Sequence, residues 1–198
     1  MADESKPAFA NPAPLGLVGF GLTTVILSLI NAGVLPPGGE QVVIPLALAY
    51  GGTIQIIAGL LEFRTGNTFG QVAFLSYGAF WYWFALLVLL GGHGVLDLSH
   101  AGSTINVTLI GWGVFTLYMW IATFKLVRAL WWIFLTLWVT FFLLGFGGLL
   151  GAPTLGLCGG WLGLVCGLLA MYLSFALVTN SVFGRTAVPV GAPFGSKG

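Results

Sequence analysis

The sequence predicts an all-α, polytopic membrane protein with six transmembrane helices, and three observations support this fold class. Hydrophobic residues make up 58% of the 198 residues and charged residues only 6%, whereas ordinary soluble domains contain about 25% charged residues. The apolar residues fall into continuous stretches of about 20 residues, the length that a helix needs to cross a bilayer. All six Lys and Arg residues fall on one side of the resulting topology, as expected when basic residues gather in cytoplasmic loops.

The composition also excludes other classes of protein. A disordered chain combines low hydrophobicity with high net charge, but the formal net charge here is +1. A nucleic-acid binder needs a basic surface to neutralise phosphates, and a soluble exterior needs many more charges. A membrane β-barrel is disfavoured because its strands alternate apolar and polar residues over about ten positions, whereas the apolar runs here are longer and continuous.

The first three expected helices each carry a distinctive face. The helix at 14–35 precedes a Pro-Pro-Gly-Gly turn, and spacings of three and four residues place polar and aromatic side chains on one face: Phe20, Thr24, Ser28 and Asn31. The helix at 42–63 has a small and polar face: Gly51, Gln55, Ala58, Gly59 and Glu62. The helix at 71–90 has an aromatic stripe: Phe74, Tyr77, Trp81 and Phe84. Such polar and aromatic faces are typical either of helix packing or of a lined path.

The last three expected helices lie at 104–124, 129–150 and 156–180. The helix at 104–124 carries Thr116 and Thr123, which lie two turns apart. The helix at 129–150 carries Thr136 and Thr140, which lie one turn apart and share a face. The third carries a ridge of small residues, which lets helix backbones approach closely: Gly159, Gly163, Gly167 and Ala170. Its cysteines, Cys158 and Cys166, would lie about 12 Å apart along the helix, which is too far for a disulfide.

The basic residues predict the orientation of the chain. They precede the first helix, follow the last one, or lie in the loops after the second and fourth: Lys6, Arg64, Lys125, Arg128, Arg185 and Lys197. We therefore expect both termini to be cytoplasmic. The chain then divides into an N-terminal segment at 1–13, a transmembrane domain at 14–180 and a C-terminal tail at 181–198. The first apolar run is long enough to span, so we interpret it as a retained helix and not as a cleaved signal.

Two polar side chains within the second helix each allow two interpretations. An unpaired amide is costly near the middle of a bilayer, so Gln55 either lines a cavity or bridges two helices. Glu62 either pairs with Arg64 at the cytoplasmic interface or serves as a proton acceptor or gate. His93 and His100 lie in an expected external loop, where they are solvated residues or, alternatively, pH sensors.

No motif predicts catalysis. The sequence has neither a GxxxxGK phosphate loop nor an HExxH metal pair, and no Ser-His-Asp set can be assembled at membrane depth. We therefore expect neither an enzyme, nor a cofactor, nor a metal site.

Several strings together resemble the acetate uptake transporter family, and in particular its bacterial succinate–acetate permeases. They are NPAPLGL at 11–17, YGG at 50–52, GLLE at 59–62, GNTFG at 66–70, SYG at 76–78, GWGVFT at 111–116 and FGRT at 183–186. The resemblance runs from about residue 11 to residue 189. It implies a homo-hexamer in a bacterial or archaeal cytoplasmic membrane, with a path for acetate or succinate through each subunit.

The resemblance also implies functional positions. The path narrows at an apolar constriction formed by Phe20, Tyr77 and Leu137, and Ala170 affects which carboxylate fits.

Further residues expected along the path are Asn11, Pro14, Leu15, Thr24, Gln55, Asn67 and Thr68. No Lys or Arg is expected deep in the membrane, which favours rapid passage over tight binding. Either polar side chains offset the cost of desolvating the anion, or the acid crosses protonated.

Two other functions stay open from the residues themselves. A channel for a neutral solute such as urea or an amide would also lack buried basic residues. A membrane scaffold without transport activity would account for the glycine-rich packing.

Overall fold

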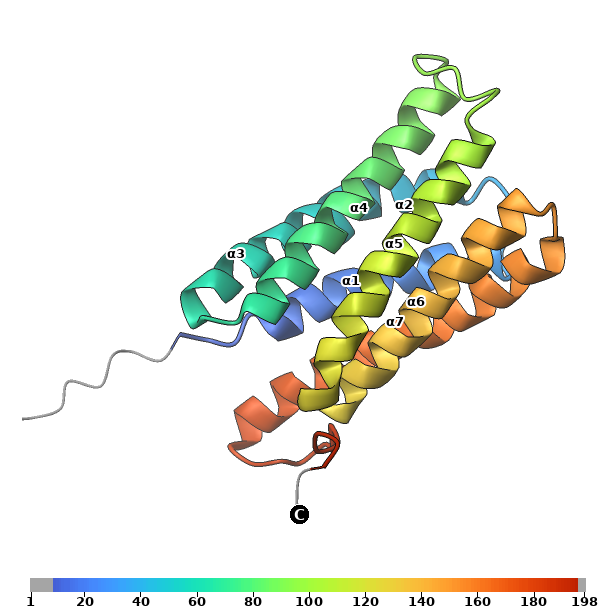
Figure 1. Ribbon diagram of the computed structural model, residues 1–198. Helices are drawn as coiled ribbons and strands as arrows, with labels where there is room; N and C mark the ends of the chain where they lie inside the picture. The colour runs from blue at the N-terminus through green and yellow to red at the C-terminus, as the bar shows by residue number, and fades with distance from the viewer. Residues whose placement is uncertain (1–8, 196–198) are drawn as a thin grey trace, which may run out of the picture.

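The computed structural model describes residues 9–195 as a bundle of six membrane-length helical segments, with no strand in that range (Figure 1). Four of the segments are single α-helices: α1 (Ala13–Asn31), α4 (Thr68–Gly92), α6 (Arg128–Leu149) and α7 (Pro153–Phe183). The second segment joins α2 (Glu40–Leu46), the π-helix η1 (Ala47–Ile54) and α3 (Gln55–Thr65). The fourth joins α5 (Gly102–Ala122) to the 3₁₀ turn η2 (Thr123–Lys125). The predicted all-α fold with six spans is confirmed, and the chain is a multi-pass membrane protein.

The helix ends differ from the expected ones by a few residues. The first helix ends at Asn31, short of residue 35, because the amides of Val34 and Leu35 both turn back to the carbonyl of Leu29. The last helix runs past residue 180 to Phe183 and ends at Gly184, which adopts a left-handed conformation. Glycine suits such a C-terminal position because it carries no Cβ.

The π-helical turn of η1 is a feature that the hydropathy pattern does not predict. It follows Pro45, which lies inside α2 and lacks the amide proton of a regular helical bond. Within η1, the hydroxyl of Thr53 donates to the carbonyl of Leu48, five residues earlier, at 2.8 Å. Segments of π-helix are rare and frequently lie at functional sites. Here α3 begins with Gln55 directly after η1.

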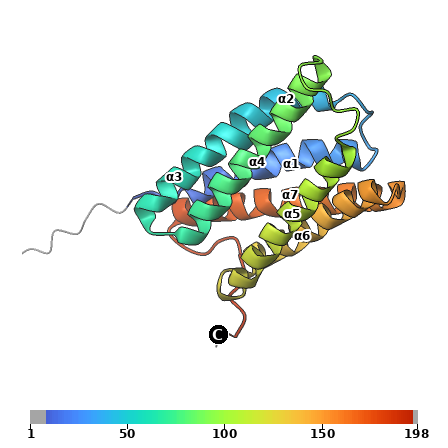
Figure 2. The same cartoon turned by 45° about the horizontal axis from the view of Figure 1, so that its top comes forward.

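The glycine ridge of α7 packs against other helices of the same chain. A Cβ on Gly167 would lie 2.9 Å from the carbonyl oxygen of Gly21 in α1, and one on Gly163 would lie 2.6 Å from Oγ of Ser28. Gly159 faces Leu144 of α6 in the same way. Helices α1 and α7 therefore run side by side at close range, as Figure 2 shows.

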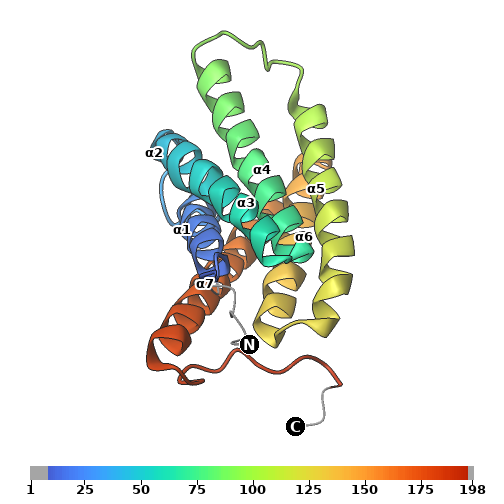
Figure 3. The same ribbon diagram turned by 90° about the vertical axis from the view of Figure 1, so that its left-hand side faces the viewer.

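The basic residues of the described chain gather at one end of the bundle. Figure 1 places the start of α1, the α3–α4 turn, the α5–α6 turn and the C-terminal tail at this end. Arg64, Lys125, Arg128 and Arg185 lie in or beside these segments. Lys6 and Lys197 lie outside the described residues. The opposite end carries the long α4–α5 loop, which is seen at the top of Figure 3.

The tail after α7 folds back onto the bundle. The side chain of Asn180 bonds to the backbone of Ala187 and Val188, each at 2.8 Å. The carbonyls of Val190 and Gly191 then accept the first amides of α6, from Ala129 and Arg128. These bonds satisfy donors that a helix N-terminus otherwise leaves free. Both cysteines of the described chain are free thiols, with Cys158 exposed and Cys166 buried.

Candidate functional site

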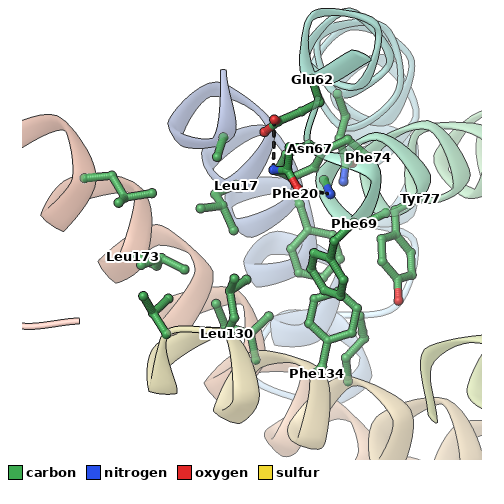
Figure 4. Close-up of a pocket in the computed structure, with 18 residues that line it drawn as sticks. Leu17, Phe20, Glu62, Asn67, Phe69, Phe74, Tyr77, Leu130, Phe134 and Leu173 are labelled. Carbon is green, nitrogen blue, oxygen red and sulfur yellow. Dashed lines mark hydrogen bonds between the residues drawn. The ribbon is translucent and has the colours of Figure 1, made fainter. Parts of the chain in front are cut away.

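A partly open cavity of about 170 Å³ lies inside the bundle, between α1, α3, α4, α6 and α7 (Figure 4). Its walls are mainly apolar, and its few polar side chains are those of Gln55, Glu62, Asn67 and Tyr77. Among residues 9–195, no Lys or Arg lines it. A small apolar cavity with a few polar groups is the usual form of a binding site for a small molecule.

The three residues expected to form a constriction meet in this cavity. Phe20 of α1, Tyr77 of α4 and Leu137 of α6 all line it and are all buried. The ring centroids of Phe20 and Tyr77 are 5.7 Å apart, within the range of favourable aromatic contacts. Three helices that are distant in the sequence therefore bring these side chains together.

Two further aromatic residues line the cavity, and neither is among the site residues expected from the sequence. Phe69 of α4 and Phe134 of α6 line it with ring centroids 5.0 Å apart, and Phe134 lies 6.1 Å from Tyr77 (Figure 4). Neither belongs to the aromatic stripe identified on the third helix. Phe134 lies one turn before Leu137, so the spacing of three along α6 is the signal that could have indicated it.

Gln55 faces the cavity from the first turn of α3. Its side chain is 1% exposed, and no group of the described chain hydrogen-bonds to its buried Oε1. An amide left without partners in an apolar interior costs free energy. The amide of Gln55 is thus available to a molecule inside the cavity.

Glu62 lies two turns further along α3 and is also 1% exposed. Its Oε2 accepts a hydrogen bond from Nδ2 of Asn67 at 2.9 Å (Figure 4). Oγ1 of Thr65 shares its one proton between the same Oε2, at 3.0 Å, and the backbone carbonyl of Glu62, at 2.9 Å. Its Oε1 has no hydrogen-bond partner among the described residues. The expected interfacial pair with Arg64 does not form in this structure, because Arg64 is exposed while Glu62 is enclosed among Thr65, Asn67 and Gly70.

The GNTFG string supplies the turn that holds Glu62 in place. Gly66 ends α3 in a left-handed conformation, with φ of 73°. Asn67 then caps α4, accepting the amide of Gly70 at 3.1 Å while donating to Glu62. A Cβ on Gly70 would lie 2.9 Å from Oε1 of Glu62, so only glycine leaves the carboxylate this room.

Six of the expected path residues do not line the cavity, and Thr24, Thr68 and Ala170 are three of them. The hydroxyl of Thr24 donates to the carbonyl of Phe20 at 2.7 Å, in its own helix. Thr68 is exposed in the first turn of α4, and Ala170 is fully enclosed in α7. Thr136 and Thr140 likewise bond to carbonyls of their own helix, as hydroxyls in membrane helices commonly do.

The NPAPLGL string forms the start of α1 and contributes to a second hollow, which is more open. Asn11, Pro14 and Leu15 line this hollow together with residues of α7. Oδ1 of Asn11 accepts the amide of Ala13 at 3.0 Å, and the carbonyl of Pro14 accepts the hydroxyl of Ser174 at 2.6 Å. Only Ala13 and Leu17 of the string reach the cavity inside the bundle.

Comparison with known proteins agrees with this architecture. The chain is 45% identical over 182 residues to the succinate-acetate/proton symporter SatP of Escherichia coli K12, covering 92% of this chain and 95% of SatP. It is 37% identical to acetate permease A of Emericella nidulans, over 92% of this chain and 66% of the permease.

A solved structure of a bacterial acetate channel, SatP, superposes with a TM-score of 0.88 at 44% identity, covering 93% of this chain and all of that one. A sequence model of the GPR1/FUN34/yaaH family matches residues 1–191. With a family match over nearly its whole length and relatives of this similarity, the chain belongs to the GPR1/FUN34/yaaH family of acetate transporters.

Proposed function

We propose that this protein transports acetate and related small carboxylates, including succinate, through the cavity inside the bundle of each subunit. The observation that carries the proposal is the cavity inside the bundle, where polar Glu62 and Asn67 line the same space as Phe20 and Tyr77 (Figure 4). Leu137 lines this space as well. The names of the similar proteins, a succinate-acetate/proton symporter, an acetate permease and an acetate channel, support the same substrate class. The proposal is for transport and not for catalysis.

The walls of the cavity favour passage over retention. A carboxylate anion inside it meets no fixed cation, so no deep electrostatic well slows its exit. Phe20, Tyr77 and Leu137 form the narrow apolar neck, which selects by size and excludes strongly hydrated ions. The amide of Gln55 offers a polar contact beside the neck and offsets part of the cost of desolvation.

Glu62 supplies the coupling to protons in this proposal. Two ionised carboxylates in a water-poor cavity repel each other strongly. A substrate anion therefore passes Glu62 when Glu62 carries a proton, or the substrate brings the proton itself. The free Oε1 of Glu62 is the atom that takes this proton, because Oε2 already accepts from Asn67 and from the shared proton of Thr65.

The orientation and assembly belong to the same proposal. The end of the bundle that carries Arg64, Lys125, Arg128 and Arg185 faces the cytoplasm, as the distribution of basic residues predicts. Six subunits form the assembly that the family resemblance implies. Cross-linking of the purified protein in detergent, followed by mass measurement, should give a six-subunit product.

Flux into proteoliposomes tests the proposed function. We expect labelled acetate to enter vesicles that contain the purified protein faster than it enters protein-free vesicles, and an inward proton gradient should increase this uptake. Labelled urea, measured in the same vesicles, tests the neutral-solute alternative. Urea uptake without acetate uptake would overturn the proposal, and no flux of either solute would favour a scaffold.

A further inference from the structure

The hydroxyl of Tyr77 is tied to a helix that does not otherwise shape the cavity. It lies 2.9 Å from Oγ1 of Thr116 in the middle of α5, and both side chains are buried. No residue of α5 lines the cavity itself. Thr116 thus reaches the neck only through Tyr77.

The donor in the hydrogen bond between Tyr77 and Thr116 follows from a second hydrogen bond that Thr116 makes. Oγ1 of Thr116 donates to the carbonyl oxygen of Trp112 at 2.7 Å. A carbonyl oxygen can only accept, and a threonine hydroxyl has one proton to give. Both bonds are therefore made only when Tyr77 is the donor and Thr116 the acceptor. The chain of donation runs from Tyr77 to Thr116 and then to Trp112.

Because Tyr77 donates to Thr116, its hydroxyl has no proton left to donate to a molecule in the cavity. Its one hydroxyl proton is committed to Thr116, and only lone-pair density remains on the oxygen. The rest of the ring lies among other aromatic rings, with centroids 5.7 Å from Phe20, 5.5 Å from Phe115 and 6.1 Å from Phe134. A carboxylate in the neck thus meets an oxygen that cannot donate to it.

We propose that Thr116 is a positioning residue for the neck: by accepting the proton of Tyr77, it fixes the ring toward α5 and prevents the hydroxyl from binding the passing carboxylate. This inference rests on the proposed transport function and on Tyr77 as part of the neck. The neck therefore binds the carboxylate weakly and releases it quickly, because the hydroxyl of Tyr77 donates its proton to Thr116.

The test replaces Thr116 by valine, which keeps the shape of the side chain and removes the acceptor. Tyr77 can then turn its proton to the substrate. We expect the apparent KM for acetate and the maximal rate to fall together, each by about three- to tenfold, the range that one hydrogen bond provides. A general loss of folded protein would lower the rate without lowering the KM.

Companion variants separate the proposed role from mere packing. Thr116→Ser keeps a hydroxyl and should therefore show the wild-type KM and maximal rate. If Thr116→Val does not fold, Thr116→Ala serves in its place, because it removes the acceptor without adding bulk. Thr108→Val is the matched control, because Thr108 lies on the same helix, is only half-buried and bonds to the carbonyl of Thr104 in its own helix. In a Tyr77→Phe background, Thr116→Val should cause no further fall in the KM, because the hydroxyl is absent.

Two results would overturn the inference while leaving the proposed function in place. One is a wild-type KM and rate in both Thr116→Val and Thr116→Ala. The other is the same change in KM in the Tyr77→Phe background as in the native one. A wild-type protein that moves no acetate would instead refute the transport function, and this inference with it.

Discussion

Glu62 is enclosed within the bundle, with one carboxylate oxygen held by Thr65 and Asn67 and the other without a partner among the described residues. We predict that Glu62→Gln flattens the dependence of acetate uptake on external pH, because an amide cannot take up the proton that we propose Glu62 carries. Uptake by proteoliposomes, measured between about pH 5 and 8, gives the profile. A pH profile identical to that of the wild type would remove Glu62 from the mechanism.

Other titratable groups serve as controls for this experiment. Hydrogen bonds from Ser99 hold the pKa of Asp97 below its usual range, so Asp97 stays ionised throughout the assay and does not produce the pH dependence. The double variant His93→Gln/His100→Gln should keep the wild-type profile, since both residues lie in the α4–α5 loop, away from the cavity. Arg64→Gln should also keep it, because Arg64 is exposed and does not hold Glu62.

The width of the neck gives a second prediction for single residues. Leu137→Ala and Phe20→Ala should each enlarge the passage and let lactate and succinate compete better with acetate uptake. Both side chains are buried, so each truncation also destabilises the fold, by about 2–5 kcal/mol. Competition assays at matched expression measure the selectivity, with Leu149→Ala as the control on the exposed end of α6. An unchanged order of carboxylates in both variants would place the neck elsewhere.

We expect Ala170 to affect the neck only indirectly. It is fully enclosed in α7 and does not line the cavity, so Ala170→Phe adds bulk where no space exists. We expect it to push the neighbouring helices inward, narrowing the neck and favouring acetate over larger acids, at a cost of about 1–3 kcal/mol from overpacking. Retained competition by succinate in a folded Ala170→Phe protein would contradict this.

At the scale of elements, the contact between α7 and α1 depends on glycine. We predict that Gly163→Leu disrupts folding, because even its Cβ would lie 2.6 Å from Oγ of Ser28 and 3.3 Å from Cγ2 of Thr140. Thermal unfolding in detergent measures the loss. Gly156→Leu is the matched control in the first turns of the same helix, where a Cβ would meet nothing within 4 Å. Equal stability of the two variants would show that the ridge is not tightly packed.

At the scale of the whole molecule, the orientation in the membrane can be measured directly. Cysteines introduced at Pro37 and His100, which are exposed in the α1–α2 and α4–α5 loops, should react with an impermeant maleimide added outside intact cells. A cysteine at Arg185 should react only after the cells are opened. Cys158 is exposed, so the background for these variants carries Cys158→Ala. Labelling in the reverse pattern would invert the proposed orientation.

Local sequence determined the six spans, the single end that carries the described basic residues, and the small-residue ridge of α7. These features depend on the length of an apolar run, on charge and on a spacing of three or four residues, all of which a linear sequence displays. The meeting of Phe20, Tyr77 and Leu137 was expected from family resemblance, and the cavity inside the bundle brings these residues together.

Only the tertiary structure decided which partners the polar groups take. Thr65 and Asn67 hold Glu62 because the left-handed turn at Gly66 folds α4 back over α3. Tyr77 meets Thr116 across 39 positions of sequence, and Phe134 enters the cavity from α6. The rotation of each helix about its axis sets these contacts. That rotation follows from close packing against several neighbours at once, which no single helix encodes.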